Sequence, residues 1–363
     1  MKIRLKDAFD LQMGKTPARN TPSYWDGDHK WISIADIGSA GKYIATTKER
    51  ITDKAITESG IRAVPAHTVI MSFKLSIGKT SITSEEMYTN EAIMAFVSKG
   101  TYDIDIDYLY HLCCGTEWTE GTNKAVMGLT LNKATLSEKR ISLPEITEQK
   151  NIAAKFDALD NVIEKTQAEL SSLDQLVKSR FVEMFGEPIY NTMRLRTMPL
   201  GKACYLKAGI TTSADTIHER SAEFSVPCYG GNGIRGYVKK ATQCGCYPIV
   251  GRQGALCGNV QFASGEFHAT EHAVLVTPII EMDVVWLFHL LKMMNLYRFH
   301  TGAAQPGLAV KTLNTVDIPI ADIVGQNQFA AFVAEVDKSK LAVKQSLEKL
   351  ETLKKSLMQK YFG

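Results

Sequence analysis

Residues 318–363, IPIADIVGQNQFAAFVAEVDKSKLAVKQSLEKLETLKKSLMQKYFG, repeat residues 141–186, ISLPEITEQKNIAAKFDALDNVIEKTQAELSSLDQLVKSRFVEMFG, without a gap. Of the 46 aligned positions, 13 are identical, which is far more than chance would give. The identities include Gln149 with Gln326 and the closing Phe-Gly pair of each copy. Because the period is about half the chain, the repeat indicates a duplicated unit and not a solenoid of short repeats.

Each copy of the repeat carries a heptad pattern that is typical of a coiled coil. Neither copy contains Pro or Gly between Asn151 and Phe185, or between Gln326 and Phe362. Two similar seams in one chain can bury each other, so we predict two long helices that pack together, each about 60 Å long. The alternative is that each helix lies on its own domain. The predicted seam residues are Phe156, Leu159, Ile163, Leu170, Leu173, Val177, Val333, Val336, Val343, Leu347, Leu350 and Leu357.

The duplication extends upstream of both helices, more weakly. The pattern Leu-x-x-Ala-x-x-Leu-x-x-Gly-x-Thr occurs at 5–16 and again at 200–211. Residues 72–78 and Glu91 align with residues 252–258 and Glu271. Each half of the chain therefore consists of a globular domain followed by a long helix.

Local patterns in the two domains predict a mixture of strands and helices. Apolar runs predict strands at 31–35, 68–73, 92–97, 248–250 and 273–276, and helices are predicted at 105–113 and 284–296. The expected fold class is α+β. Two mixed α/β domains, 1–144 and 187–320, are joined to long helices at 145–186 and 321–363.

Composition places few limits on function. Hydrophobic residues make up 45% of the chain and charged residues 22%, with no apolar run of membrane-spanning length. The start, MKIRLKDAFD, lacks the apolar core of a signal peptide, and seven scattered cysteines favour reduced thiols in the cytoplasm. Residues 1–145 carry 18 basic and 18 acidic side chains, so charge neither indicates nor excludes a nucleic-acid partner.

Three short motifs suggest catalysis, but their context argues against it. His268-x-x-Glu271-His272 fits a zinc-protease pattern, yet the strand-like run AVLVTP follows it. Residues 231–236 fit G-x-G-x-x-G, but a strand-like segment follows where a dinucleotide site needs a helix. Gly78-Lys79-Thr80 lacks the first glycine of a phosphate-binding loop, because residue 73 is Phe. We therefore expect a chain that is not an enzyme and holds no metal or cofactor.

The order of motifs in each half resembles the specificity (S) subunit of type I restriction–modification systems, over essentially the whole chain. The first half reads GKTP at 14–17, YW-x-G at 24–27 and WISI-x-DI at 31–37. The second half reads YGGNGI-x-GY at 229–237 and GR-x-G at 251–254, and closes with G-x-x-QP-x-L at 302–308. The second half opens with GITT where the first has GKTP, so the two domains should read different sequences.

This resemblance implies two target-recognition domains held by an antiparallel pair of long helices. Each domain would read one half of a split double-stranded DNA site, and the helices would fix the gap. Two modification (methyltransferase) subunits would supply S-adenosylmethionine and adenine methylation, and restriction subunits would add translocation and cleavage that use ATP and Mg. The alternative is a coiled-coil scaffold or interaction protein without DNA recognition.

Candidate DNA contacts follow from the chemistry of base edges. In the major groove Arg or Lys suits guanine, and Asn or Gln suits adenine. Trp25 and Trp31 are expected to pack within their domain and not to stack on bases. The candidates in the first domain are Lys15, Thr16, Arg19, Lys74, Lys79 and Lys124. Those in the second domain are Tyr229, Asn232, Arg235, Arg252, Gln253 and Gln305.

Overall fold

The computed structural model describes residues 1–74, 76–118, 131–302 and 306–363. The chain forms two compact units: unit 1 comprises Met1–Thr166 and Ser346–Gly363, and unit 2 comprises Gln167–Gln345. Each unit thus combines one globular domain with one segment of each long helix. Two predicted DNA contacts, Lys124 and Gln305, lie outside the described residues. Across the described ranges, no helix is long and apolar enough to span a membrane.

The described residues of unit 1 form three sheets and five short α-helices. Strands β1 (Lys2–Arg4) and β10 (Arg140–Ser142) form an antiparallel pair. The main sheet has the order β2 (Phe9–Met13), β9 (Ile93–Ser98), β6 (Val69–Ser72), β7 (Thr80–Thr83) and β4 (Tyr43–Ile44). A smaller sheet has the order β5 (Glu49–Ile51), β3 (Trp25–Ile32) and β8 (Tyr88–Thr89). The helices are α1 (Leu5–Ala8), α2 (Ile34–Ala40), α3 (Asp53–Ser59), α4 (Ile106–Gly115) and α5 (Lys133–Glu138).

Unit 2 repeats this plan with local changes. Strands β11 (Arg196–Pro199) and β20 (Asp317–Ile320) form the antiparallel pair. The main sheet has the order β12 (Cys204–Ala208), β19 (Ala273–Pro278), β16 (Tyr247–Gly251) and β17 (Val260–Ala263). The smaller sheet has the order β14 (Gly233–Val238), β13 (Val226–Gly230), β18 (Glu266–Ala269) and β15 (Gln243–Cys244). The helices are α7 (Leu200–Ala203), α8 (Val284–Met293) and α9 (Val310–Asn314).

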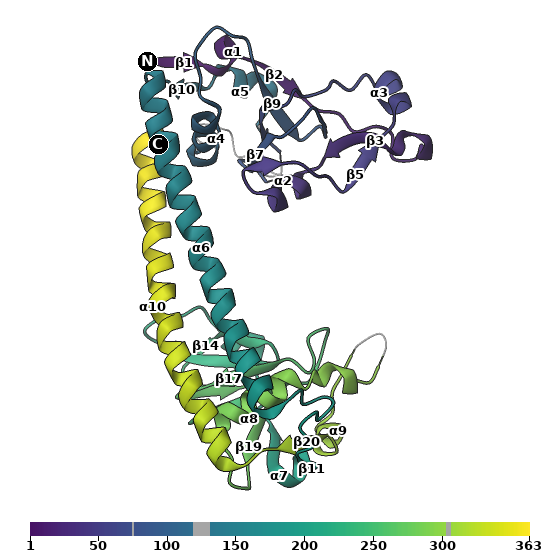
Figure 1. Ribbon diagram of the computed structural model, residues 1–363, viewed down its shortest axis with the longest axis vertical. Coiled ribbons are helices and arrows are strands. Elements are labelled where there is room, and N and C mark those ends of the chain that lie inside the picture. Colours follow the sequence, from purple (N-terminus) through teal and green to yellow (C-terminus); the bar gives the residue numbers. More distant parts are fainter. Residues whose placement is uncertain (75, 119–130, 303–305) are drawn as a thin grey trace. The chain divides into compact units, whose positions relative to one another are not determined.

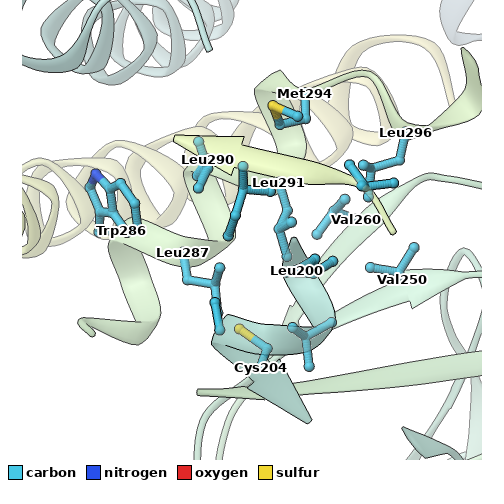
Figure 2. Close-up of a cluster of buried hydrophobic side chains, with 14 of the residues drawn as sticks. Leu200, Cys204, Val250, Val260, Trp286, Leu287, Leu290, Leu291, Met294 and Leu296 are labelled. Carbon is cyan, nitrogen blue, oxygen red and sulfur yellow. The ribbon is translucent and has the colours of Figure 1, made fainter. Parts of the chain in front are cut away.

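The core of unit 2 forms where α8 covers the main sheet. The Asp283 side chain caps the start of α8 by accepting a hydrogen bond from the backbone N–H of Trp286 at 2.8 Å. Leu287, Leu290 and Leu291 of α8 are fully buried. Figure 2 shows their side chains among those of Leu200, Cys204, Val250 and Val260. Burying this apolar helix face holds the sheet and thereby the loops at its edge.

The long helices α6 (Ile146–Phe185) and α10 (Ile323–Phe362) contribute to both units. Within unit 1, the first part of α6 lies beside the last part of α10 (Figure 1), and Lys354 forms an ion pair with Asp160. Within unit 2, Lys340 pairs with Asp174 at 2.7 Å. Both ion pairs have the same antiparallel register. All twelve predicted seam residues are buried or half-buried.

The repeated glutamines join each domain to α6 or α10. In unit 1 the Gln149 side chain accepts a hydrogen bond from the backbone N–H of Asp105 at 2.9 Å and donates to the carbonyls of Asp103 and Pro144. In unit 2 Gln326 accepts from the N–H of Asp283 at 2.9 Å and donates to a neighbouring carbonyl. Asp105 and Asp283 are the N-caps of α4 and α8. One buried amide in each unit therefore fixes a domain helix to a long helix.

Most predicted elements are confirmed, and one is wrong. The strands at 68–73, 92–97, 248–250 and 273–276 and both domain helices lie where the patterns place them. The strand predicted at 31–35 instead ends at Ile32, and α2 begins at Ile34. The reason is Ser33, which forms a capping box with Asp36 and so starts a helix.

Candidate DNA-recognition surfaces

The smaller sheets of the two units share a scaffold but present different structures at its end. Strand β3 pairs in parallel with β8, with Ile32 beside Thr89, and strand β13 pairs in parallel with β18, with Tyr229 beside Ala269. After β3 the chain enters helix α2, whereas after β13 it turns back as strand β14. The same position in the fold therefore carries a helix in unit 1 and a hairpin in unit 2.

A second loop differs in length between the units. The backbone N–H of Phe73 donates to the carbonyl of Ala92 at 3.0 Å, and the N–H of Arg252 donates to that of His272 at 3.1 Å. Since Ala92 and His272 each follow the repeated glutamate, Phe73 is the counterpart of Arg252. The gapless alignment of 72–78 with 252–258 is therefore wrong at its start, where it paired Ser72 with Arg252.

The alignment is correct at its other end, where it pairs Gly78 with Gly258, because the two loops end with the same backbone hydrogen bond. The N–H of Gly78 donates to the carbonyl of Ser72 at 2.9 Å, and the N–H of Gly258 donates to that of Gly251 at 2.7 Å. Both glycines have positive φ, 89° and 81°. The loop of unit 2 is thus one residue longer than that of unit 1.

Three of the predicted contacts in unit 2 lie together. Asn232, Arg235 and Gln253 line a shallow surface cavity of about 520 Å³ between the hairpin turn of β13–β14 and the loop after β16. Arg235 and Gln253 are exposed, and Asn232 accepts a hydrogen bond from the side chain of Asn259. The other lining residues are Gly231, Gly233, Ile234, Ala255, Leu256 and His272.

A close backbone contact brings these two loops together. A Cβ atom on Gly251 would lie 2.2 Å from the carbonyl oxygen of Gly231, and one on Gly231 would lie 3.1 Å from the Cα of Gly251. Glycine at both positions therefore allows the hairpin turn to pack against the end of β16. The first glycine of the G-x-G-x-x-G motif, Gly231, therefore has a structural role in this contact. As predicted, the motif does not precede a helix.

The remaining described candidates of unit 2 are less exposed. Tyr229 is half-buried, with its ring 5.5 Å from that of Phe267. Arg252 is also half-buried, and its backbone carbonyl accepts from the N–H of Leu308 at 2.8 Å. Its main chain thus joins the loop to the closing segment of the domain.

One residue of the His268–His272 segment, His272, lines the cavity. His268 lies at the end of β18 and Glu271 in the turn before β19, so the two histidines do not share a helix face. Although burial opposes ionisation, backbone N–H donors, including that of Thr212 at 3.1 Å, hold the pKa of Glu271 below its usual value. Among the described residues, no group of side chains is arranged to hold a metal ion.

In unit 1, three predicted contacts already have partners within the domain. The Lys15 amine donates to the backbone carbonyl of Ser59, and the Thr16 hydroxyl donates to Glu91. Arg19 forms a bidentate pair with Glu49, and its guanidinium lies 4.1 Å from the ring centre of Trp25. Sequence reasoning found polar residues on this loop but not the acceptors that engage them.

Lys74 lies on the loop of unit 1 that corresponds to 252–258, and Lys79 directly follows that loop, before β7. Lys74 is half-exposed, with its amine 5.3 Å from the centre of the Phe73 ring, and Lys79 is exposed beside Gly38 of α2. The packing role predicted for the tryptophans is confirmed: Trp31 is 1% exposed and forms an edge contact with Trp25 at 5.2 Å.

A charged cluster joins this side of unit 1 to the long helix. Lys42, at the turn after α2, contacts Asp107 of α4 at 2.8 Å and Asp157 of α6 at 2.5 Å. Asp157 also contacts the Nε2 of buried His111 at 2.7 Å. Burial lowers the pKa of His111 despite the carboxylate, while hydrogen bonds from Lys42 and His111 outweigh burial and lower the pKa of Asp157.

Two similar α+β domains, each tied to a segment of an antiparallel helix pair, define the architecture of a duplicated specificity subunit. Residues 1–175 match the family model described as "Type I restriction modification DNA specificity domain". The chain is 31% identical over 361 residues to the type I restriction enzyme EcoprrI specificity subunit of Escherichia coli, covering 92% of this chain and 87% of that protein. It therefore belongs to the family of type I restriction enzyme specificity subunits.

The chain also resembles a second curated specificity subunit over about half of its length, and two solved structures share its fold. The MjaIX specificity subunit of Methanocaldococcus jannaschii is 28% identical over 194 residues, covering 52% of this chain and 44% of that protein. The solved S subunit from M. genitalium aligns over 100% of this chain and 96% of its own, with a TM-score of 0.60 and 16% identity. A structure described under complex assembly and conformational transition of the type I R-M system covers 100% and 97%, with a TM-score of 0.63 and 17% identity.

Proposed function

We propose that each domain of this specificity subunit reads one half of a bipartite, gapped DNA target. The observation that carries the proposal is a repeated scaffold with unlike loops at one position. Unit 1 presents α2 with Lys74 and Lys79 nearby, and unit 2 presents a hairpin with Asn232, Arg235 and Gln253. Since base edges are distinguished by the placement of such donors and acceptors, the unlike loops suit unlike half-sites.

The same proposal assigns catalysis to partner subunits. Two modification subunits would bind this chain, one for each repeated unit, and would supply S-adenosylmethionine and adenine methylation. Restriction subunits would supply the chemistry that needs ATP and Mg. This chain would act as the non-catalytic DNA-specificity component of the assembly. The duplication supports the stoichiometry, because two similar units can bind two copies of one partner in the same way.

Mapping of adenine methylation by long-read sequencing tests the proposal. The host genome would be compared with and without this gene. Loss of one gapped, two-part motif on deletion is the expected result, and restoring the gene should restore the motif. If the methylated motifs are identical in both strains, and the purified chain does not bind a methyltransferase subunit, the scaffold interpretation replaces this one.

The helices supply a second test, because we propose that their length sets the gap. Deleting residues 164–170 together with 344–350 removes facing heptads and preserves the register of both ion pairs, Asp160–Lys354 and Asp174–Lys340. Seven residues correspond to about 10 Å of helix, so the gap should shorten by about three base pairs or fewer. The deletion of 164–170 alone is the mismatched control and should prevent assembly. An unchanged gap in the paired deletion would show that the helices do not set it.

A further inference from the structure

The cavity of unit 2 has an apolar component that the sequence did not predict. Ile234, the second residue of β14, is 52% exposed, and Leu256, in the loop after β16, is 56% exposed. Both line the cavity that also contains Asn232, Arg235 and Gln253. Single exposed apolar residues are common on protein surfaces. Two exposed apolar side chains in one cavity, beside amide and guanidinium groups, are less common and suggest a binding surface with both apolar and hydrogen-bonding contacts.

This combination matches one base pair of the major-groove code. An A·T pair presents the N7 acceptor and N6 donor of adenine together with the C5-methyl group of thymine. A Gln or Asn side chain can bond both adenine groups, and an apolar side chain can contact the methyl group. Gln253 is exposed, and its side chain makes no hydrogen bond to the rest of the described chain.

The geometry of the cavity favours Gln253 over Asn232 as the adenine contact. The Asn232 carbonyl already accepts a hydrogen bond from Asn259, which holds that amide against the β17 side of the cavity. Gln253 and Leu256 lie on the same loop. The Gly231–Gly251 contact places this loop against the turn that precedes β14, the strand that carries Ile234. One amide and two apolar side chains therefore line the same cavity, from the start of β14 and from the loop after β16.

We infer that this cavity reads an A·T pair in the half-site of unit 2, with Gln253 on adenine and Ile234 and Leu256 on the thymine methyl group. The inference rests on the proposed function and deepens it. In this inference Gln253, Ile234 and Leu256 distinguish one base pair from another and take no part in the methylation reaction. Ile234 and Leu256 would contribute an apolar contact to the thymine methyl group, which the amide of Gln253 does not make.

The test uses the complete methyltransferase complex and synthetic duplexes carrying its mapped motif. Each thymine of both half-sites is replaced in turn by deoxyuridine, which keeps the pairing and removes only the methyl group. With the unaltered chain, methylation at subsaturating DNA should slow about fourfold at one position of one half-site, the factor that corresponds to about 0.8 kcal/mol for a buried methyl group. Ile234→Ala and Leu256→Ala should each reduce this difference at that position and leave the other positions unaffected.

A second substitution tests the adenine contact at the same base pair. Replacing the adenine by 7-deazaadenine removes the N7 acceptor, which should slow the unaltered complex but not the Gln253→Ala complex. Ile279→Ala is the matched control, because Ile279 is 61% exposed in the same unit and does not line the cavity. It should keep both discriminations.

The outcomes separate the inference from the function on which it rests. If the unaltered complex distinguishes no thymine from deoxyuridine in either half-site, or if the Ile234 and Leu256 variants keep the full difference, the inference is overturned while the proposed function stands. If the unaltered complex methylates no gapped motif at all, the proposed function fails and the inference fails with it.

Discussion

The two recognition domains differ most where their sheets end and least where they meet the long helices. At the sheet ends, α2 of unit 1 is replaced by the β13–β14 hairpin, and the loop after β16 gains a residue over the loop after β6. At the helix joints, equivalent glutamines, Gln149 and Gln326, accept a hydrogen bond from the backbone N–H of the N-cap residue of α4 and of α8. The comparison indicates that, after duplication, the attachment of each domain to the long helices was kept while the loops at the sheet ends diverged.

The joints also differ in how deeply an aromatic anchor is buried, and this predicts the largest effect. Phe185 is 5% exposed and lies 6.0 Å from Trp286, whereas its repeat partner Phe362 is half-exposed and lies 5.6 Å from Tyr108. Phe185→Ala should lower the free energy of unfolding by about 3–5 kcal/mol, and Phe362→Ala by clearly less. Denaturant unfolding of both variants measures this. Leu353→Ala, at an exposed α10 position, is the control, and equal losses in the two Phe variants would contradict the comparison.

Histidines at equivalent positions of the two units predict the next largest effect, a change of stability with pH. His111 of α4 has a carboxylate partner, but Ala334 replaces that aspartate in unit 2, and burial lowers the pKa of His289 from 6.5 to about 4. Between these pH values the unfolded chain binds more protons, so stability falls as pH falls from about 6.5 to about 4, by up to about 3 kcal/mol.

His289→Leu should remove this contribution to the loss of stability in acid. Unfolding free energies at pH 7.0 and 4.5 in the variant and the unaltered chain provide the measurement, with the pH values chosen near the limits of the window. His218→Leu, at an exposed histidine of the same unit, should retain the full loss. If the His289 variant loses as much stability in acid as the unaltered chain, the half-buried imidazole of His289 is not the cause.

The arginines of unit 2 predict a change confined to one half-site. Arg252→Ala or Arg235→Ala should weaken recognition by about 1–3 kcal/mol if the guanidinium binds a guanine through two hydrogen bonds. Sequence preference should be lost only in the half-site read by unit 2, because both arginines belong to that unit. In unit 1 the counterpart of Arg252 is the buried Phe73. Methylation mapping with each variant measures this. Unaltered methylation of the native motif would remove that arginine from the set of contacts.

The lysines of unit 1 predict the smallest effect, one that is independent of sequence. Lys79→Ala should weaken DNA binding equally for native and altered sites, and should reduce the slope of log affinity against log salt by about 1 if Lys79 contacts a phosphate. Binding titrations of the assembled complex at several salt concentrations measure the slope. Lys338→Ala on α10 is the control and should leave it unchanged. A change in motif preference would instead identify Lys79 as a base contact.

Sequence reasoning was strongest for the helices and their joints, because the repeat compares each residue with a second copy. The identity of Gln149 and Gln326 marked a polar residue that is buried in both units. The loops could not be predicted as well. The one-residue shift between Phe73 and Arg252 depends on backbone hydrogen bonds, and the Gly231–Gly251 contact joins loops that no spacing relates.

The candidate contacts show the same limit. Residue type identified Arg19 and Thr16 as possible base contacts, but their engagement by Glu49 and Glu91 depends on strand pairing across the domain. Conversely, Ile234 and Leu256 carry no signal in the sequence that separates them from core residues. Their exposure follows only from where the start of β14 and the loop after β16 lie in the folded domain.

The buried glutamine at each joint has a consequence for how such a chain can change over generations. Gln149 and Gln326 recognise backbone groups at the start of α4 and α8, and not particular side chains of the domain. A foreign domain that ends in a similar helix start and closing strand would meet the same amide in the same way. Recombination at these joints can therefore exchange one reading domain for another while the assembly keeps its shared parts, so new specificity can arise in a single genetic event.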